Sequence, residues 1–178
     1  MSLKLALAIG WGVFGLYWLL AAVGVKAAVQ SRRARPSALL VVLAIVLLRV
    51  FKTNGLVVHS LVLEVVGLIA FACGLGLAVW ARIFLGRNWG MPMTEKAQPE
   101  LVTSGPYRFV RHPIYSGILL AFLGTALATN LFLLIAVVLL GIYFTYSARV
   151  EERLLINSFP STYPGYQAST KMMIPFVL

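Results

Sequence analysis

The sequence predicts an all-α membrane protein with about five transmembrane helices. Of its 178 residues, 61% are hydrophobic and only 11% are charged, whereas charged residues make up about a quarter of an ordinary soluble domain. The apolar residues form long runs without charges, and the basic residues lie between those runs. A helix of about 20 apolar residues crosses the ~30 Å hydrocarbon core of a bilayer. Runs of this kind therefore predict membrane spans and not the core of a soluble domain.

The first part of the chain, residues 1–80, is predicted to hold three spans. The first runs from Leu5 to Val25. A signal peptide is the alternative there, since Lys4 precedes the run, but the run is longer than the apolar region of a usual signal. The second span, Ser37–Val50, is short and follows a basic loop. The third span is predicted at Leu61–Trp80.

The second part, residues 81–178, is predicted to be the catalytic half of what is a single domain overall. A polar segment from Arg82 to His112 precedes two further apolar runs, Ile114–Ala128 and Leu131–Ser147. Only the pair Thr129-Asn130 joins these runs. So tight a connection predicts an antiparallel helical hairpin, which would bring its two outer ends to the same side of the membrane.

The distribution of basic residues predicts the orientation. Twelve of the fifteen Lys and Arg residues fall on one side of this arrangement, and Lys4, Arg49 and Lys52 fall on the other. The positive-inside rule then places the N-terminus outside and the C-terminus in the cytoplasm. An even number of spans would break this division, which is a separate reason to favour five. A prokaryotic inner membrane is expected from the small size and from the lack of a cleavable signal.

Composition also argues against several functions. The net charge of +10 is explained by membrane topology, so no nucleic-acid partner is predicted. The single cysteine, Cys73, lies within an apolar run, and His59 and His112 are predicted on opposite sides of the membrane. No metal site is therefore predicted.

A dense polar cluster marks the start of the predicted hairpin. Pro113 suits the first turn of a helix, whose early N–H groups then lie near the membrane surface, where they can meet an anionic group. Arg111 and His112 can add charge and hydrogen bonds, and Tyr115 offers an aromatic face. The alternative is an interfacial belt of tyrosine and arginine that anchors the helix. The candidate binding residues are Tyr107, Arg111, His112, Pro113, Tyr115 and Gly117.

A second cluster, Arg149 to Arg153, continues the last predicted span. At helical spacing Arg149 is expected to share a face with Glu152 and Arg153, while Glu151 points elsewhere. Surface ion pairs are the plain alternative. However, two of only five acidic residues are adjacent here, and the hairpin places them on the same side as His112.

Together these runs resemble a known family. The run LVTSGPYRFVRHPIYSG (Leu101–Gly117) and, after the hairpin, EERLLINSFPSTYPGY (Glu151–Tyr166) resemble the isoprenylcysteine carboxyl methyltransferase and phospholipid methyltransferase superfamily of integral-membrane enzymes. The resemblance covers about the C-terminal half of the chain. The segment from Phe159 to Tyr163 departs from it, because the family frequently has a Phe-Gly-acidic-acidic-Tyr pattern at this place.

The resemblance implies an enzyme that transfers a methyl group from S-adenosylmethionine at the cytoplasmic ends of the last spans. His112, Pro113, Tyr115 and Gly117 match the motif that lines the cofactor, and Glu151 or Glu152 would close the site. Tyr115, together with Tyr107 or Trp89, is expected to hold the sulfonium by cation–π contact. Arg111 would join His112 on the carboxylate or ribose of the cofactor.

The acceptor is expected to be amphiphilic or dissolved in the membrane. A prenylated protein C-terminus, a phospholipid amine and a small isoprenoid acid fit equally well. A carboxylate acceptor would be fixed by Arg149 or Arg153 and would need no base. An amine or a thiol would need a glutamate as base, with Glu152 the candidate catalytic carboxylate.

Two functions of other classes stay open at this point. Membrane sterol reductases carry a similar His-Pro-x-Tyr element, so an NADPH-dependent membrane reductase of an isoprenoid or sterol-like substrate is one alternative, although no separate glycine-rich phosphate loop is present. A non-catalytic membrane scaffold is the other. The oligomeric state stays open as well.

Overall fold

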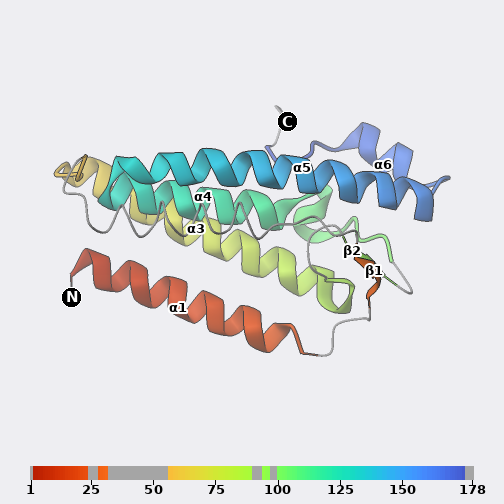
Figure 1. Cartoon of the computed structure of the whole chain (residues 1–178), viewed down its shortest axis with the longest axis horizontal. Helices are drawn as coiled ribbons and strands as arrows, with labels where there is room; N and C mark the ends of the chain where they lie inside the picture. The colour runs from red at the N-terminus through yellow and green to blue at the C-terminus, as the bar shows by residue number, and fades with distance from the viewer. Residues whose placement is uncertain (1, 24–27, 32–55, 90–93, 97–99, 175–178) are drawn as a thin grey trace.

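Four long helices dominate the computed structural model, which describes residues 2–23, 28–31, 56–89, 94–96 and 100–174. They lie lengthwise beside one another, with α1, α3 and α5 running in one direction and α4 returning (Figure 1). The predicted second span, residues 37–50, lies outside the described residues, so the count of five spans stays a prediction. The helices are α1 (Leu3–Ala21), α3 (Leu61–Leu85), α4 (Pro113–Thr129) and α5 (Leu134–Ser158).

The helices have the length and composition of membrane spans. Among the described residues, three helical segments are long and apolar enough to cross a bilayer: Leu3–Ala21, Leu61–Asn88 and Leu131–Ser158. Helix α4 is also apolar but has 17 residues, which span about 25 Å at 1.5 Å per residue. Large apolar side chains of α1 are exposed, such as Leu16 and Leu20. Lipid is the solvent that suits such a surface, and the protein is an integral membrane protein.

The predicted hairpin is present. Helix α4 begins at Pro113, ends at Thr129 and is followed by a short 3-10 turn, η3 (Leu131–Leu133). The side chain of Asn130 caps this turn by accepting a hydrogen bond from the Phe132 amide at 2.9 Å. Helix α5 then continues to Ser158 without a break.

The polar segment between α3 and α4 differs from the prediction. Helix α3 does not end near Trp80 but continues through Arg82 to Leu85. The fold is also not entirely helical, since β1 (Ala28–Ser31) and β2 (Thr94–Lys96) form an antiparallel pair. Pairing between strands so distant in sequence leaves no local periodic pattern to detect. The remaining short elements are η1 (Gly86–Asn88), η2 (Gly105–Arg108) and α6 (Tyr163–Ser169).

Helices α3 and α4 pack backbone against backbone along a row of small residues. A Cβ added to Gly74 of α3 would lie 2.4 Å from the amide nitrogen of Ala121. A Cβ on Gly124 of α4 would lie 2.3 Å from the amide nitrogen of Phe71. Because the hydrophobic effect does not drive helices together within lipid, van der Waals packing at such close approach is a main source of helix association. This contact fixes the position of α4, and with it the residues at the start of α4.

Candidate functional site

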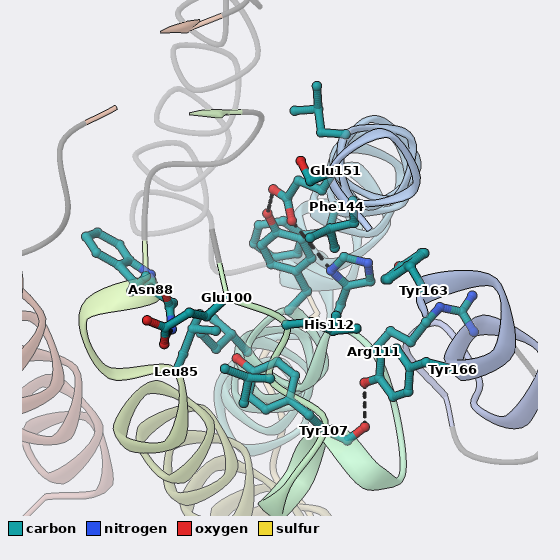
Figure 2. A pocket seen from close by; sticks show the side chains of 18 of the residues that line it. Leu85, Asn88, Glu100, Tyr107, Arg111, His112, Phe144, Glu151, Tyr163 and Tyr166 are labelled. Atoms are coloured by element: carbon teal, nitrogen blue, oxygen red, sulfur yellow. Dashed lines mark hydrogen bonds and ion pairs between the residues drawn. The ribbon is translucent and has the colours of Figure 1, made fainter. Parts of the chain in front are cut away.

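A cavity of about 590 Å³ lies at the end of the bundle where α4 begins and where α1, α3 and α5 end. Its volume lies within the range of small-molecule sites, roughly 300–1,000 Å³. Figure 2 shows side chains from several elements converging on it. Rings and carboxylates share its wall: Trp18, Trp89, Tyr107, Tyr115, Phe144, Tyr163 and Tyr166, with Glu100, Glu151 and His112.

One wall is a stack of three rings. The ring of Tyr115 is parallel to those of His112 and Phe144, with centroids 5.5 and 4.5 Å away. The Tyr115 hydroxyl donates a 2.5 Å hydrogen bond to Oε1 of Glu151, and Nδ1 of His112 lies 3.5 Å from Oε2 of the same carboxylate. The contacts with Glu151 fix two of the rings at the cavity from the side of α5.

Behind this wall lies a buried ion pair. Nε of Arg111 donates to Oε1 of Glu152 at 2.6 Å, and both side chains are less than 10% exposed. The other carboxylate oxygen accepts from Nε2 of Gln167 at 2.9 Å. The guanidinium also donates to the backbone oxygens of Gln167 and Thr170. The pair therefore ties α6 to the start of α4 and to the end of α5.

The segment after α6 holds the histidine motif in place. The amides of Arg111 and His112 donate to the backbone oxygens of Lys171 and Met172 at 2.8 and 2.9 Å. The hydroxyl of Ser116 donates to the oxygen of Met173 at 2.6 Å. These bonds satisfy polar groups at the start of α4, where the backbone N–H groups have no intrahelical partners.

The opposite side of the cavity holds Trp89, which was expected near the sulfonium, together with Asn88, Glu100 and Trp18, which were not predicted to bind a ligand. The buried Asn88 donates from Nδ2 to Oε2 of Glu100 at 2.9 Å, and both residues line the cavity (Figure 2). Trp89 and the α1 residue Trp18 meet there edge to face, with centroids 5.7 Å apart. The sequence offered one signal, the scarcity of acids, since Glu100 is one of only five.

The predicted binding residues divide into two groups in the structure. Tyr107, Arg111, His112, Tyr115 and Glu151 line the cavity. Pro113 and Gly117 are buried but do not line it. Gly117 instead faces α3, where its added Cβ would lie 2.6 Å from the backbone oxygen of Gly74. The space that Gly117 leaves is thus used for helix packing.

The second cluster has a different geometry from the prediction. Arg149 and Arg153 are exposed and do not line the cavity, whereas Glu152 is buried. The prediction that Glu152 shares a face with the two arginines while Glu151 points elsewhere is wrong. Successive residues on a helix are 100° apart, and α5 meets the first turn of α4 between positions 151 and 152. Both carboxylates therefore approach His112, with Oε1 of Glu152 3.4 Å from Nε2.

Three tyrosines around this cluster are held neutral by burial. Burial raises the pKa of Tyr107 and of Tyr163 above the ordinary tyrosine range. It also raises the pKa of Tyr166 to about 12. The hydroxyl of Tyr166 donates to the backbone oxygen of Tyr107 at 2.5 Å. This bond links α6 to η2.

A Tyr166→Phe variant tests this link through pH. At neutral pH it should be less stable by about 1 kcal/mol, the usual net value of one hydrogen bond. The pKa of the Tyr166 hydroxyl is about 12 in the folded protein and ~10 in an unfolded chain. The neutral hydroxyl therefore stabilises the fold fully below pH ~10, and this stability is lost as the pH rises toward 12. The stability difference between parent and variant should therefore shrink between pH 10 and 12 in chemical unfolding titrations. A difference that stays constant over this range would contradict the assignment.

Fold and cavity together define a helical integral membrane protein with a ligand site at one end of its bundle. A sequence profile of the phospholipid methyltransferase family matches residues 62–162, which is more than half of the chain. The chain therefore belongs to the phospholipid methyltransferase family. The resemblance seen in the two sequence runs is confirmed, and the matched region includes both of the helices that form the hairpin.

Individual relatives match about half of the chain. Methanethiol S-methyltransferase 1 of Bradyrhizobium diazoefficiens is 39% identical over 82 residues, which are 46% of this chain and 28% of that protein. Protein-S-isoprenylcysteine O-methyltransferase of Saccharomyces cerevisiae is 37% identical over 79 residues, 43% of this chain and 33% of that protein. The cobalt-zinc-cadmium resistance protein CzcN of Cupriavidus metallidurans is 35% identical over 94 residues, which are 51% of this chain and 43% of that protein. The matches span less than half of each relative.

A solved structure shows the same fold. The eukaryotic intramembrane Ras methyltransferase ICMT superposes with a TM-score of 0.62 at 23% sequence identity. The superposition covers 84% of this chain and 55% of that protein. Similarity at this level of identity establishes the shared helical arrangement.

Proposed function

We propose that this protein is an S-adenosylmethionine-dependent methyltransferase that acts on an amphiphilic acceptor. The observation that carries the proposal is the cavity wall, where a ring stack and a carboxylate, His112–Tyr115–Phe144 with Glu151, stand at the end of a membrane-spanning bundle. Membership of a methyltransferase family supports it. The positive-inside rule supports a cytoplasmic position for this end.

The residues of the cavity suit S-adenosylmethionine, which supplies an electrophilic methyl group on a sulfonium when bound. Aromatic faces attract such a cation by about 0.5–2 kcal/mol, and Tyr115 and Trp89 would provide them. Carboxylates suit its ammonium group and its ribose hydroxyls, and Glu151 and Glu100 line the cavity.

The acceptor would rest its apolar part on the other wall. Trp18 and Leu19 of α1, and Ala22 directly after it, line the cavity there and carry no charge. Arg149 and Arg153 are exposed away from the cavity, so neither is placed to fix a carboxylate acceptor. We therefore propose a neutral nucleophile, an amine or a thiol, as the group that receives the methyl. Glu151, which lines the cavity, would take its proton in place of the predicted Glu152, which is held in the ion pair with Arg111.

Calorimetric titration of the detergent-purified protein with S-adenosylmethionine tests the proposal. A Tyr115→Phe variant keeps the ring stack but loses the hydrogen bond to Glu151, so affinity should fall about tenfold, equivalent to ~1.4 kcal/mol. His112→Ala should lose more, because it removes a ring of the stack. Arg153→Ala is the control and should bind as the parent does, since Arg153 is exposed outside the cavity.

The competing ligand NADPH is titrated under the same conditions. Binding of NADPH by a parent protein that ignores S-adenosylmethionine would overturn the proposal in favour of a reductase. Absence of binding by both ligands, with the fold intact by circular dichroism, would reject a catalytic site of either kind.

A further inference from the structure

Helix α1 is attached to the bundle at three levels, the first near its start, where Leu7 is buried in a cluster with Phe71 and Ala121. At its middle, Nε1 of Trp11 donates to Oγ1 of Thr125 at 3.2 Å, and its ring packs against Phe71 and Phe122. At its end, Trp18 contacts Trp89 edge to face. Most of its other large apolar side chains are exposed. The position of its last turn, which contributes a wall of the cavity, therefore depends on few contacts.

A single arginine of α3 lies at this end. Arg82 is 4% exposed. Its Nη1 donates to the backbone oxygen of Gly86 at 2.6 Å, and its Nη2 donates to the backbone oxygen of Ala21. The same guanidinium stands over the ring of Trp89, 4.8 Å from the centroid. Arg82 itself does not line the cavity.

These contacts place one positive charge between two helix ends. Ala21 is the last residue of α1, and Gly86 follows the last residue of α3. The final carbonyls of a helix lack intrahelical partners and carry the negative end of its dipole. Since α1 and α3 run in the same direction (Figure 1), their negative ends lie on the same side of the bundle. A guanidinium that donates to both ends offsets this repulsion.

We infer that Arg82 is a positioning residue that docks the end of α1 against α3 and thereby completes the cavity. Without it the last turn of α1, with Trp18 and Leu19, separates from Trp89 together with the following Ala22, and the cavity loses its uncharged wall. Arg82 would shape the cavity in this way for any ligand. Only the link to methyl transfer rests on the proposed function. The competing explanation is that Arg82 only caps its own helix through Gly86.

Distance measurement between spin labels separates the two explanations. Labels are attached at Leu20→Cys on α1 and Ile142→Cys on α5, in a Cys73→Ser background, because both positions are exposed and the two helices lie on opposite sides of α3 and α4 in Figure 1. The parent should give one narrow distance distribution. Arg82→Met should give a broad one, whereas Arg87→Met, at an exposed position five residues later, should stay narrow. A narrow distribution in Arg82→Met would overturn the inference.

An Arg82→Lys variant and a spectroscopic signature complete the test. Lysine keeps the charge but has no planar fork to reach two carbonyls, so the distance distribution of Arg82→Lys should be intermediate. This variant carries the test if Arg82→Met does not fold.

The coupled Trp18 and Trp89 rings should contribute to near-ultraviolet circular dichroism, and this contribution is measured as the difference between the spectra of the parent and of Trp18→Phe. Arg82→Met should lose most of this difference. An unchanged spectrum would show that α1 stays docked.

Cofactor titration of the same variants distinguishes this inference from the proposed function. The ring stack and Glu151 belong to α4, to its N-cap His112 and to α5, and Trp89 follows η1, so all of them remain when α1 separates. S-adenosylmethionine should therefore still bind to Arg82→Met, with an affinity that changes by less than about threefold, or ~0.65 kcal/mol. If the parent does not bind S-adenosylmethionine at all, the proposed function fails while the distance measurement still decides the role of Arg82.

Discussion

Glu152→Ala is expected to destabilise the protein by about 3–5 kcal/mol, because it leaves the Arg111 guanidinium as a buried charge without its counterion. The pair is 2.6 Å long and almost fully buried. Its loss also frees Gln167, which donates to the same carboxylate. Unfolding is measured by titrating detergent-solubilised protein with a denaturing detergent and following tryptophan fluorescence.

Two further variants separate a lost ion pair from a lost contact. Arg153→Ala, one position along the same helix, should change the stability by less than about 0.5 kcal/mol, because Arg153 is exposed. The double variant Arg111→Met with Glu152→Leu removes both charges and should recover part of the loss. If Glu152→Ala is as stable as the parent, the pair contributes nothing and the account of this end of the bundle is wrong.

Gly74→Ala and Gly76→Ala should change stability in opposite directions although they lie two residues apart on α3. The methyl of Gly74→Ala would meet the backbone of Ala121 at 2.4 Å. Backbone cannot rotate away as a side chain can, so the helices must separate, at a cost of about 1–3 kcal/mol or more. Nothing lies within 4 Å of a Cβ on Gly76, where alanine should stabilise by about 0.5–1 kcal/mol through helix propensity.

Thermal unfolding of both glycine variants in the same detergent provides the measurement. Gly74→Ala should also weaken S-adenosylmethionine binding, because His112 is the N-cap of α4 and Tyr115 lies in its first turn. Equal melting temperatures for the two variants would show that α3 and α4 are not in backbone contact along this row.

Much of this structure follows from local sequence patterns. The hairpin is fixed by the brevity of Thr129-Asn130 and by the proline at the start of α4, both of which act within a few residues. The polar run before α4 indicated a binding site, and Tyr107, His112 and Tyr115 do line the cavity. The family resemblance rested on the same run and is confirmed by the family match.

What the sequence did not reveal depends on contacts between distant segments. Arg111 was predicted to meet a ligand, yet its guanidinium binds Glu152 on α5 and two carbonyls of the C-terminal segment. Gly117 was expected to line the cofactor site, but it packs against α3 instead. The Asn88–Glu100 wall lies in a segment without hydrophobic periodicity, where only the tertiary fold shows which residues meet.

The pairing of Lys171 and Met172 with Arg111 and His112 also sets an order of assembly during synthesis. The histidine motif leaves the ribosome some 60 residues before the segment that holds it, a separation seen directly in the residue numbers. The hairpin, whose contacts are local, can insert into the membrane during that interval, whereas closing a long loop comes later. A nascent chain that stops short of residue 171 would thus lack the acceptors of the Arg111 and His112 amides, so the start of α4 would stay unsupported until the C-terminal segment is made.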